Sequence, residues 1–471
     1  MKIAICTSEA VSFAKTGGMA DVCGALPHAL EDLGHEVIVI MPKYQAVRSS
    51  GILFKNLDRD FDWTMIGDTI KVYFLKHDMY LREGLYGDRF GDYPDNLKRF
   101  SYLSSKTLEF FRKINFNPDI IHCHDWQTSL IPVLAKAYGQ KFFFTGEKKP
   151  ATLLTIHNVS YQGIFSKEQM PDTGLGWEYF SVSGLEFYDK INLLKGGILY
   201  ADLINTVSVT HSQEIQRKEF GCGLEGVLTG RKDRFFGIVN GVDYKIWNPQ
   251  GDPYIFKNYS MDTIEDKKMN KVNLQETCGL AKDEKLPLLG FVGRLVGQKG
   301  IDLILKVLPS LCQRGMQVVI LGIGEVKFET ALAEIARQFP KLIFVGSRFD
   351  DQLAHRIYAA SDIFLMPSKF EPCGIGQLIS FKYGTVPVVY KTGGLADTVI
   401  DYSLKNSAGT GFVLTKYDDA EFLLAIQRAV ELFADKKKWR DLLKRLMRLN
   451  FSWKESAKEY VALYEKARRL V

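Results

Sequence analysis

The stretch Lys15-Thr16-Gly17-Gly18-Met19-Ala20-Asp21-Val22 returns almost unchanged as Lys391-Thr392-Gly393-Gly394-Leu395-Ala396-Asp397-Thr398. Each copy follows a short apolar run typical of a β-strand, residues 3–6 or 386–389, and opens a helical pattern. Paired glycines at a strand-to-helix turn leave backbone amides bare, and the helix N-terminus and the lysine add positive charge. This combination suits a phosphate group. Either copy alone is equally well explained as a tight turn that needs glycine, so the pairing is what indicates a two-domain, phosphate-binding protein.

The remaining sequence alternates between apolar strand-like runs and amphipathic helical patterns. Strands are expected at residues 3–6, 37–41, 72–75, 119–122, 151–156, 203–207, 235–239, 288–292, 317–321, 342–345, 363–366 and 386–389. Helices are expected at 21–33, 96–112, 126–137, 301–311, 326–337, 351–359, 375–383 and 453–470. Continuous apolar strands separated by helices indicate parallel sheets covered on both faces. The sequence therefore predicts an α/β protein with two doubly wound parallel-sheet domains.

The domain boundary is expected at the turn sequence Asn240-Gly241-Val242-Asp243. We therefore expect an N-terminal domain at 1–243, a C-terminal domain at 244–453, and a final helix at 454–471 that packs back on the N-terminal domain. Ligands of open α/β sheets bind outside the carboxyl ends of the strands, so a cleft faced by both sheets is the expected site. Residues 80–95 lack a clear period and are expected to form a long, functional loop.

Composition excludes several classes of protein. The 471 residues are 46% hydrophobic and 25% charged, with a formal net charge of +6, which is typical of a globular chain and suits an anionic small substrate. No dense basic patch with interleaved aromatic residues is present, so no nucleic acid is expected as a partner. No apolar run is long enough to span a membrane, so no membrane partner is expected. We make no prediction of oligomeric state.

Cysteine and histidine usage points to a cytoplasmic protein without a metal site. The seven cysteines form no CxxC pair, and no signal peptide is visible at the N-terminus. The sequence His122-Cys123-His124 contains residue types that bind zinc, but no further metal ligand is spaced nearby as a zinc site requires. The sequence therefore favours a reducing cytoplasm and predicts no bound metal.

Two clusters at strand ends in the first half carry candidate site residues. His124-Asp125-Trp126 places an acid and an indole at a strand-to-helix turn, although a helix cap by Asp125 over a buried Trp126 explains it equally well. Thr155-Ile156-His157-Asn158 ends the next strand, where a histidine can hydrogen-bond a hydroxyl group of a ligand. A lone histidine is more often structural, and that alternative stays open for His157.

The second half carries the most informative cluster. Residues 293–300 read GRLVGQKG and place Arg294 and Lys299 on one glycine-rich loop after a strand. Two fixed cations on such a loop match a diphosphate, because charge-assisted hydrogen bonds are the strong ones. Residues 367–376 read PSKFEPCGIG and place Glu371 at another strand end, just before a helix. A carboxylate there can accept hydrogen bonds from sugar hydroxyls or stabilise positive charge at a reacting carbon.

At these motifs the chain resembles the bacterial glycogen synthases and plant starch synthases, over nearly its whole length. These are retaining glucosyltransferases with two Rossmann-like domains that face each other across a deep cleft, the GT-B type. The motifs that carry the resemblance are KTGGMADV at Lys15, HCHDWQ at His122, TIHN at Thr155, NGVD at Asn240, GRLVGQKG at Gly293, PSKFEPCGIGQ at Pro367 and KTGGLADTV at Lys391. Each motif alone is weak, but seven in the family's order are specific.

Together with the two glycine turns, the resemblance implies a set of site residues. The expected catalytic residues are Lys15, Asp125, His157, Arg294, Lys299 and Glu371. The expected substrate-binding residues are Gly17, Gly18, Tyr93, Asn240, Phe349, Cys373, Gly374, Ile375, Thr392 and Gly393. By the resemblance, the lysines and the arginine hold the diphosphate of a sugar nucleotide, whereas His157, Asn240 and Glu371 orient the glucosyl ring.

The resemblance also implies the reaction. Glucose would pass from ADP-glucose to the 4-hydroxyl of an α-1,4-glucan, glycogen or starch, with retention, and no metal or cofactor would be required. Two positions depart from related patterns: Phe349 stands where the family often has a tyrosine, and Ile379 stands where many related transferases have a second acid. The second departure favours the starch and glycogen branch. The expected location is the cytoplasm, or the plastid stroma for a plant-type enzyme.

Rival functions remain open at this point. A related transferase that uses UDP-glucose or makes a disaccharide, and a non-catalytic glucan-binding paralogue, share the same fold. A nicotinamide oxidoreductase is a more distant alternative, since Gly322-Ile323-Gly324-Glu325 hints at a dinucleotide turn but lacks the third glycine. The presence of Lys15, Arg294, Lys299 and Glu371 favours the catalytic transferase.

Overall fold

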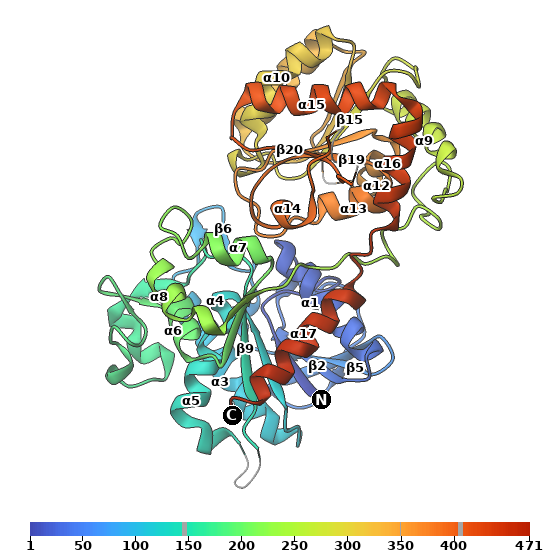
Figure 1. The fold of residues 1–471 in the computed structure, drawn as a ribbon. Coiled ribbons are helices and arrows are strands. Elements are labelled where there is room, and N and C mark those ends of the chain that lie inside the picture. The colour runs from blue at the N-terminus through green and yellow to red at the C-terminus, as the bar shows by residue number, and fades with distance from the viewer. Residues whose placement is uncertain (144–147, 349, 404–407) are drawn as a thin grey trace. The chain divides into compact units, whose positions relative to one another are not determined.

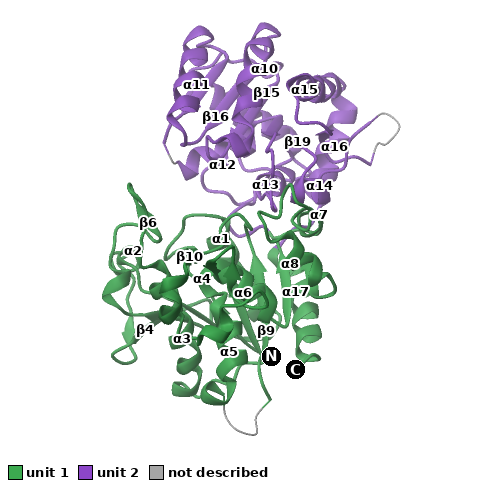
Figure 2. Ribbon diagram, turned by 90° about the vertical axis from the view of Figure 1, so that its left-hand side faces the viewer, with its two compact units in different colours: residues 1–241, 453–471 green, residues 242–452 purple. Residues whose placement is uncertain are grey.

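The computed structural model describes residues 1–143, 148–348, 350–403 and 408–471. The described chain divides into two compact units, coloured separately in Figure 2: unit 1 comprises Met1–Gly241 and Trp453–Val471, and unit 2 comprises Val242–Ser452. The first boundary follows Gly241, whereas it was expected after residue 243. Trp453, expected in the second domain, belongs to unit 1.

The two connections between the units pass side by side, which explains these boundaries. The Val242 backbone N–H donates to the Phe451 carbonyl oxygen at 2.7 Å. A Cβ atom on Gly241 would lie 2.5 Å from the Cα atom of Trp453, so only glycine allows this close passage.

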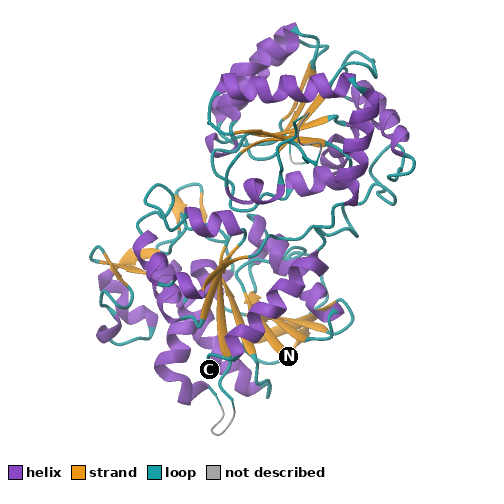
Figure 3. Ribbon diagram, in the orientation of Figure 1, coloured by secondary structure: helices purple, strands orange, loops and turns teal. Residues whose placement is uncertain are grey.

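A mostly parallel sheet forms the centre of unit 1, with the strand order β14-β13-β9-β8-β1-β2-β5-β4-β3. Its strands are β1 (Lys2–Cys6), β2 (Glu36–Pro42), β3 (Lys55–Asn56), β4 (Phe61–Ile66), β5 (Ile70–Leu75), β8 (Ile120–His124), β9 (Ala151–Ile156), β13 (Leu203–Thr206) and β14 (Phe235–Gly237). Only the edge pairs β3–β4 and β4–β5 are antiparallel among these strands of the described chain. Every residue of β8 and β9 is buried, because helices cover both faces of the sheet (Figure 3).

Helices from both ends of the sequence cover the unit 1 sheet. They are α1 (Gly18–Asp32), α2 (Gln45–Arg48), α3 (Asn96–Lys113), α4 (Asp125–Thr128), α5 (Leu130–Phe142), α6 (Leu193–Tyr200), α7 (Val209–Glu214), α8 (Glu225–Gly230) and the C-terminal helix α17 (Trp453–Arg468). Helix α17 packs against α1 and β9 (Figure 1) and buries Tyr460 and Tyr464 completely. The C-terminal helix is therefore part of the core of unit 1.

Unit 2 is a doubly wound domain with the parallel strand order β17-β16-β15-β18-β19-β20. Its strands are β15 (Leu288–Val292), β16 (Gln317–Leu321), β17 (Ile343–Gly346), β18 (Ile363–Met366), β19 (Val386–Tyr390) and β20 (Phe412–Leu414). Its helices are α9 (Lys267–Thr277), α10 (Ile301–Gln313), α11 (Val326–Gln338), α12 (Asp351–Ala360), α13 (Gly376–Lys382), α14 (Gly393–Thr398), α15 (Asp419–Ala434) and α16 (Lys436–Arg448). Counted along the unit this is the order 3-2-1-4-5-6, the Rossmann arrangement.

The structure confirms every expected strand and the fold class, but corrects several local expectations. Strand β8 continues to His124, so the turn to the next helix begins at Asp125. Residues 80–95, expected as a loop, contain the short strands β6 (Gly87–Asp88) and β7 (Gly91–Asp92). A small antiparallel sheet of β10 (Ile164–Ser166), β12 (Lys190–Asn192) and β11 (Glu186–Phe187) was not expected at all.

None of the helices in the described ranges combines the length and the apolar character that crossing a membrane demands. Each of the seven cysteines, all of which lie in the described chain, is a free thiol.

Candidate active site

The strand order of unit 2 marks one place for a ligand. Strands β15 and β18 are neighbours, and the chain winds outward from them in opposite directions. Ligands of open α/β sheets bind beyond the carboxyl ends of the strands at such a switch point. The loops that follow these two strands are residues 293–300 and 367–375, which are the loops that the sequence analysis singled out.

Lys299 and Glu371, one from each loop, form an ion pair at this switch point. The Lys299 Nζ atom donates to Glu371 Oε2 at 2.6 Å, and the Ser368 hydroxyl donates to the same oxygen at 3.0 Å. The Glu371 side chain is 8% exposed and that of Lys299 is 22% exposed. Arg294 lies on the same loop with an exposed side chain whose NH2 group donates to Gln298 Oε1 at 3.3 Å. The structure therefore joins two predicted residues directly and leaves a second cation accessible beside them.

Backbone contacts hold the two loops together. The Lys369 N–H donates to the Gln298 carbonyl at 2.8 Å, and the Gln298 side chain donates to the Phe370 carbonyl at 3.2 Å. Gly300 has a φ of +75°, and a Cβ atom there would lie 2.1 Å from the Pro367 carbonyl oxygen. Glycine at this position is thus required for the loops to meet.

The turn from Glu371 to helix α13 contains three predicted donor-binding residues, Cys373, Gly374 and Ile375. Gly374 has a φ of +74°, which favours glycine. The fully buried Gln377 side chain donates to the carbonyls of Gly374 and Cys373 at 2.8 and 3.2 Å. Gln377, which sequence reasoning missed, therefore holds this turn in place from the buried side.

The second glycine turn packs against the Glu371 loop instead of facing solvent. Thr392 is 2% exposed, and Gly393 and Gly394 are buried. The Gly394 N–H donates to the carbonyls of Glu371 and Pro372 at 3.1 and 3.2 Å. The expectation that both glycine turns leave their amides bare is therefore wrong for Gly394, whose amide supports the Glu371 loop.

The first glycine turn, at the corresponding switch point of unit 1, is open. Strands β1 and β8 are neighbours there, and Gly17 and Gly18 follow the loop after β1, both exposed. A Cβ atom on either glycine would meet nothing within 4 Å. The Lys15 Nζ atom pairs with Asp21 Oδ1 at 2.7 Å, and both side chains are partly exposed. This copy of the octapeptide is the one that fits an anion-binding turn.

A buried carboxylate that sequence reasoning missed, Glu9, supports this turn. Glu9 is 2% exposed. Its oxygens accept hydrogen bonds from the Thr16 N–H at 2.5 Å, the Thr16 hydroxyl at 2.7 Å and the Gly17 N–H at 3.3 Å. The Tyr86 hydroxyl, from the segment expected as a loop, also donates to Glu9 at 2.6 Å. Glu9 thus connects the glycine turn to the Tyr86 segment, and the expectation of a bare amide is wrong for Gly17 too, because its N–H donates to Glu9.

Asp125 sits at the end of β8 in a conformation unusual for a residue with a side chain. Its φ is +54°, and non-glycine residues in this region are concentrated at functional sites. Its Oδ1 atom accepts from the His157 N–H at 2.7 Å. Burial, as the largest cause, raises the pKa of Asp125 to about 7, although the backbone hydrogen bonds from His157 and Asn158 lower it. The N-cap residue of α4 is His124 and Asp125 is its first residue, so the alternative interpretation of Asp125 as the helix cap is wrong.

His157 lies beside Asp125, after β9. Its Nε2 atom is 2.9 Å from His124 Nδ1. Burial lowers the pKa of His157 to about 3, so its imidazole is neutral at physiological pH. A neutral imidazole held in this way can form a hydrogen bond with a sugar hydroxyl, but it has no positive charge with which to attract a phosphate.

The remaining predicted residues lie apart from these contacts. The Tyr93 ring lies 4.6 Å from the Arg82 guanidinium carbon, and its hydroxyl accepts from the Gly84 N–H at 3.3 Å. Asn240 is 4% exposed, and its Oδ1 atom has no partner among the described residues. Phe349 lies outside the described residues.

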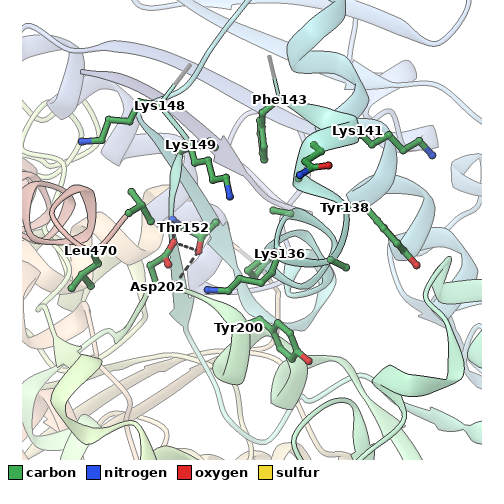
Figure 4. A pocket seen from close by; sticks show the side chains of 17 residues that line it. Lys136, Tyr138, Lys141, Phe143, Lys148, Lys149, Thr152, Tyr200, Asp202 and Leu470 are labelled. Atoms are coloured by element: carbon green, nitrogen blue, oxygen red, sulfur yellow. Dashed lines mark hydrogen bonds between the residues drawn. The ribbon is translucent and has the colours of Figure 1, made fainter. Parts of the chain in front are cut away.

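An open hollow of about 970 Å³ lies elsewhere in unit 1 (Figure 4). Lys136, Lys149 and Tyr200 line it, and at its floor Asp202 accepts hydrogen bonds from Thr152. Thr152 is near the start of β9, so this hollow is at the amino end of the sheet, away from the switch point where ligands bind. We therefore assign the candidate site to the strand ends.

Comparison with known proteins identifies the class of protein. Residues 2–230 match the family model described as starch synthase catalytic domain, and residues 277–443 match glycosyl transferases group 1. The fold is also that of sucrose-phosphate synthase from Thermosynechococcus elongatus, at 16% identity over 99% of this chain and 98% of that chain, with a TM-score of 0.62. The chain is thus a glycosyltransferase of the GT-B fold class.

Closer relatives define its family. A glycogen synthase of Syntrophotalea carbinolica and one of Thermosipho melanesiensis are each 44% identical, over 99% of this chain and 99% of their own. The catalytic domain of starch synthase IV from Arabidopsis thaliana, solved bound to ADP and acarbose, is 32% identical over 99% of both chains, with a TM-score of 0.88. The chain belongs to the glycogen synthase family.

Proposed function

We propose that this protein transfers glucose from ADP-glucose to the non-reducing 4-hydroxyl of an α-1,4-glucan, with retention of configuration. The observation that carries the proposal is the Lys299–Glu371 pair at the switch point of a Rossmann sheet, in a chain that matches glycogen synthases end to end. The starch synthase IV relative, solved with ADP and acarbose, supports an adenine nucleotide as the donor and an α-glucan as the acceptor.

The proposed roles follow from charge and burial. Lys299, Arg294 and Lys15 neutralise the diphosphate as its bond to the glucosyl C1 atom breaks, which is electrostatic stabilisation where charge develops. Glu371, buried and hydrogen-bonded, is placed to accept from glucosyl hydroxyls or to stabilise positive charge at C1. The acceptor O4 bonds to C1 on the face that the diphosphate leaves, and its proton passes to the departing phosphate oxygen.

Neutral and buried groups of unit 1 are proposed to orient the sugar. The neutral imidazole of His157 and the side-chain amide of Asn240 can hydrogen-bond an uncharged sugar ring without placing a charge beside it. The amide of Gly18 is proposed to contact the phosphates, and Gly17, whose own N–H donates to Glu9, is proposed to let them approach because nothing lies within 4 Å of the place of a Cβ atom at either glycine. Substrate contacts beside Glu371 are proposed for the remaining predicted residues of unit 2, which are Thr392, Gly393 and the turn at Cys373–Ile375.

We also propose that the reaction needs no metal ion, because the lysines and the arginine supply the positive charge. Within the described part of the chain, no three His, Cys, Asp or Glu side chains gather where they could hold an ion. The free thiols favour a reducing cytoplasm as the place of the reaction.

A donor panel tests the proposal. The purified protein is incubated with ADP-, UDP- or GDP-glucose and glycogen, and release of the nucleoside diphosphate and elongation of the glucan are measured together. We expect ADP-glucose to give the highest kcat/KM and Glu371→Gln to abolish both signals. A preference for UDP-glucose would replace the donor in the proposal, and glycogen binding without turnover of any donor would identify a glucan-binding paralogue.

A further inference from the structure

Three histidine rings follow one another from the core of unit 1 to its candidate site. His122 and His124 belong to β8, and His157 follows β9. The ring centroids of His122 and His124 lie 4.1 Å apart, and those of His124 and His157 lie 5.2 Å apart. Burial lowers the pKa of His122 and His157 to about 3 and that of His124 well below its usual value. Each ring is therefore neutral, with one N–H donor and one acceptor nitrogen.

The position of the proton on His122 follows from its partners. The Thr155 hydroxyl donates to Asn205 Oδ1 at 2.6 Å, so it can only accept from His122 Nε2, which lies 2.6 Å away. The proton of His122 is thus on Nε2. Its Nδ1 atom accepts from the Tyr464 hydroxyl of helix α17 at 2.8 Å. The C-terminal helix and the strand ends together fix this ring.

His124 has a different environment, which leaves two arrangements to compare. Its Nδ1 atom is 2.9 Å from His157 Nε2, and its own Nε2 atom is buried without a partner among the described residues. If His157 donated this hydrogen bond, His124 would carry its proton on Nε2, as a buried N–H with no acceptor. If His124 donates, only a lone pair stays unpaired. Orphaned buried N–H groups are the rarer of the two in proteins, so donation by His124 is favoured.

We propose that His124 is a positioning residue that holds His157 in the tautomer with its proton on Nδ1. His157 then presents an N–H donor to an oxygen atom of the bound sugar, since its Nε2 atom is engaged with His124. The identity of the ligand as a sugar rests on the proposed function, whereas the tautomer does not. The ligand group that this arrangement selects is a hydroxyl or ring oxygen acting as acceptor.

The arrangement also fixes the orientation of the ring. Asp125 accepts from the His157 backbone N–H at 2.7 Å, and its neighbour His124 holds the His157 ring at 2.9 Å. Two consecutive residues at the end of β8 thus restrain the main chain and the side chain of His157. Helix α17 restrains the preceding ring of the series through Tyr464.

Nitrogen NMR tests the tautomer directly on the full chain. The protein is labelled with ¹⁵N-histidine, and two-bond ¹⁵N–¹H correlations separate the two neutral tautomers. The eight histidines give a small set of signals, and loss of one set in His157→Gln assigns His157. We expect the Nδ1–H pattern for His157 and the Nε2–H pattern for His122. An Nε2–H pattern for His157 in the wild-type protein would overturn the proposal.

Two variants at residue 124 connect the tautomer to activity. His124→Leu removes the donor, so the His157 signals should shift toward a tautomer mixture and kcat/KM for the glucosyl donor should fall about tenfold. His124→Asn offers a side-chain N–H to His157 Nε2 and should restore the Nδ1–H pattern and most of the activity. A His124→Leu variant that keeps a pure Nδ1–H pattern would show that His124 does not set it. Absence of all transfer activity in a wild-type protein with the expected spectrum would refute the proposed function and leave the tautomer assignment intact.

Discussion

The ion pair between Lys299 and Glu371 yields a prediction that separates stability from turnover. The two atoms are 2.6 Å apart, and Glu371 is the more buried partner, with 8% of its side chain exposed. Replacing Lys299 by Met leaves the Ser368 hydroxyl as the only side-chain donor at this oxygen among the residues that the structure describes. Breaking a fully buried pair costs about 3–5 kcal/mol, because one charge stays uncompensated.

Lys299 is 22% exposed, so solvent screens part of this effect. We therefore expect Lys299→Met to lower the free energy of unfolding by about 2 kcal/mol. The double variant Lys299→Met/Glu371→Gln should regain about half of that loss, because a neutral amide needs no counter-charge. Turnover should fall by about 10²–10³ in Lys299→Met, since a charge that stabilises the leaving diphosphate is lost, and it should not recover in the double variant.

Urea unfolding and nucleoside diphosphate release, measured on the same preparations, check both parts. Lys327→Met is the matched control, because Lys327 pairs with Glu325 at the same distance of 2.6 Å but is 68% exposed. That variant should change stability by less than about 1 kcal/mol and leave turnover unchanged. Wild-type stability in Lys299→Met would refute the argument about the buried charge. Turnover within about threefold of wild type would remove Lys299 from the leaving-group site.

Three further outcomes follow from single features of the site. Activity should survive exhaustive chelation by EDTA, and a loss that magnesium or manganese restores would show that Lys15, Arg294 and Lys299 are not sufficient. Glu9→Gln places an amide against the Thr16 and Gly17 donors, so the KM for the glucosyl donor should rise about tenfold, whereas Tyr86→Phe, which removes only one donor, should have a smaller effect. Because burial raises the pKa of Asp125 to about 7, ionisation of Asp125 destabilises the fold progressively as pH rises from about 4 to 7. Asp125→Asn should therefore stabilise the protein more at pH 8 than at pH 5, and an equal effect at both would refute the raised pKa.

The sequence predicted those features whose cause is local. Strands such as β9 are apolar at every position because helices cover both faces, so the pattern alone reveals them. The pairing of Lys299 with Glu371 was foreseeable because both follow strands of one sheet, whose carboxyl ends share an edge. The edge strand β3 and its neighbour β4 were missed, because strands that are partly exposed lack the continuous apolar run.

Features that depend on distant residues could not be read from the sequence. Glu9 gains its importance from Thr16 and from Tyr86, which is separated from it by 77 positions in the chain. His122 owes its proton position to Thr155 and Asn205, which lie on two other strands, and its second nitrogen accepts from Tyr464, on a helix whose docking on unit 1 only the fold reveals. Periodicity and motif spacing contain no signal for such hydrogen bonds, although an acid three residues after the end of the first strand, as Glu9 is, could have been considered as a candidate.

The two octapeptides show how far identical residues can differ in role, and they allow this difference to be tested. A Cβ atom on Gly394 would lie 2.0 Å from the Cys373 carbonyl oxygen, so alanine there must displace the loop that carries Glu371. A Cβ atom on Gly18 would meet nothing within 4 Å, so alanine fits without strain. We expect Gly394→Ala to lower both the unfolding midpoint and kcat, because the loop and the buried carboxylate move together. Gly18→Ala should unfold like the wild type and raise only the KM for the glucosyl donor, through crowding of the bound phosphate. Equal losses of stability in the two variants would mean that the first turn is also a packing element, and its assignment as the anion-binding copy would be wrong.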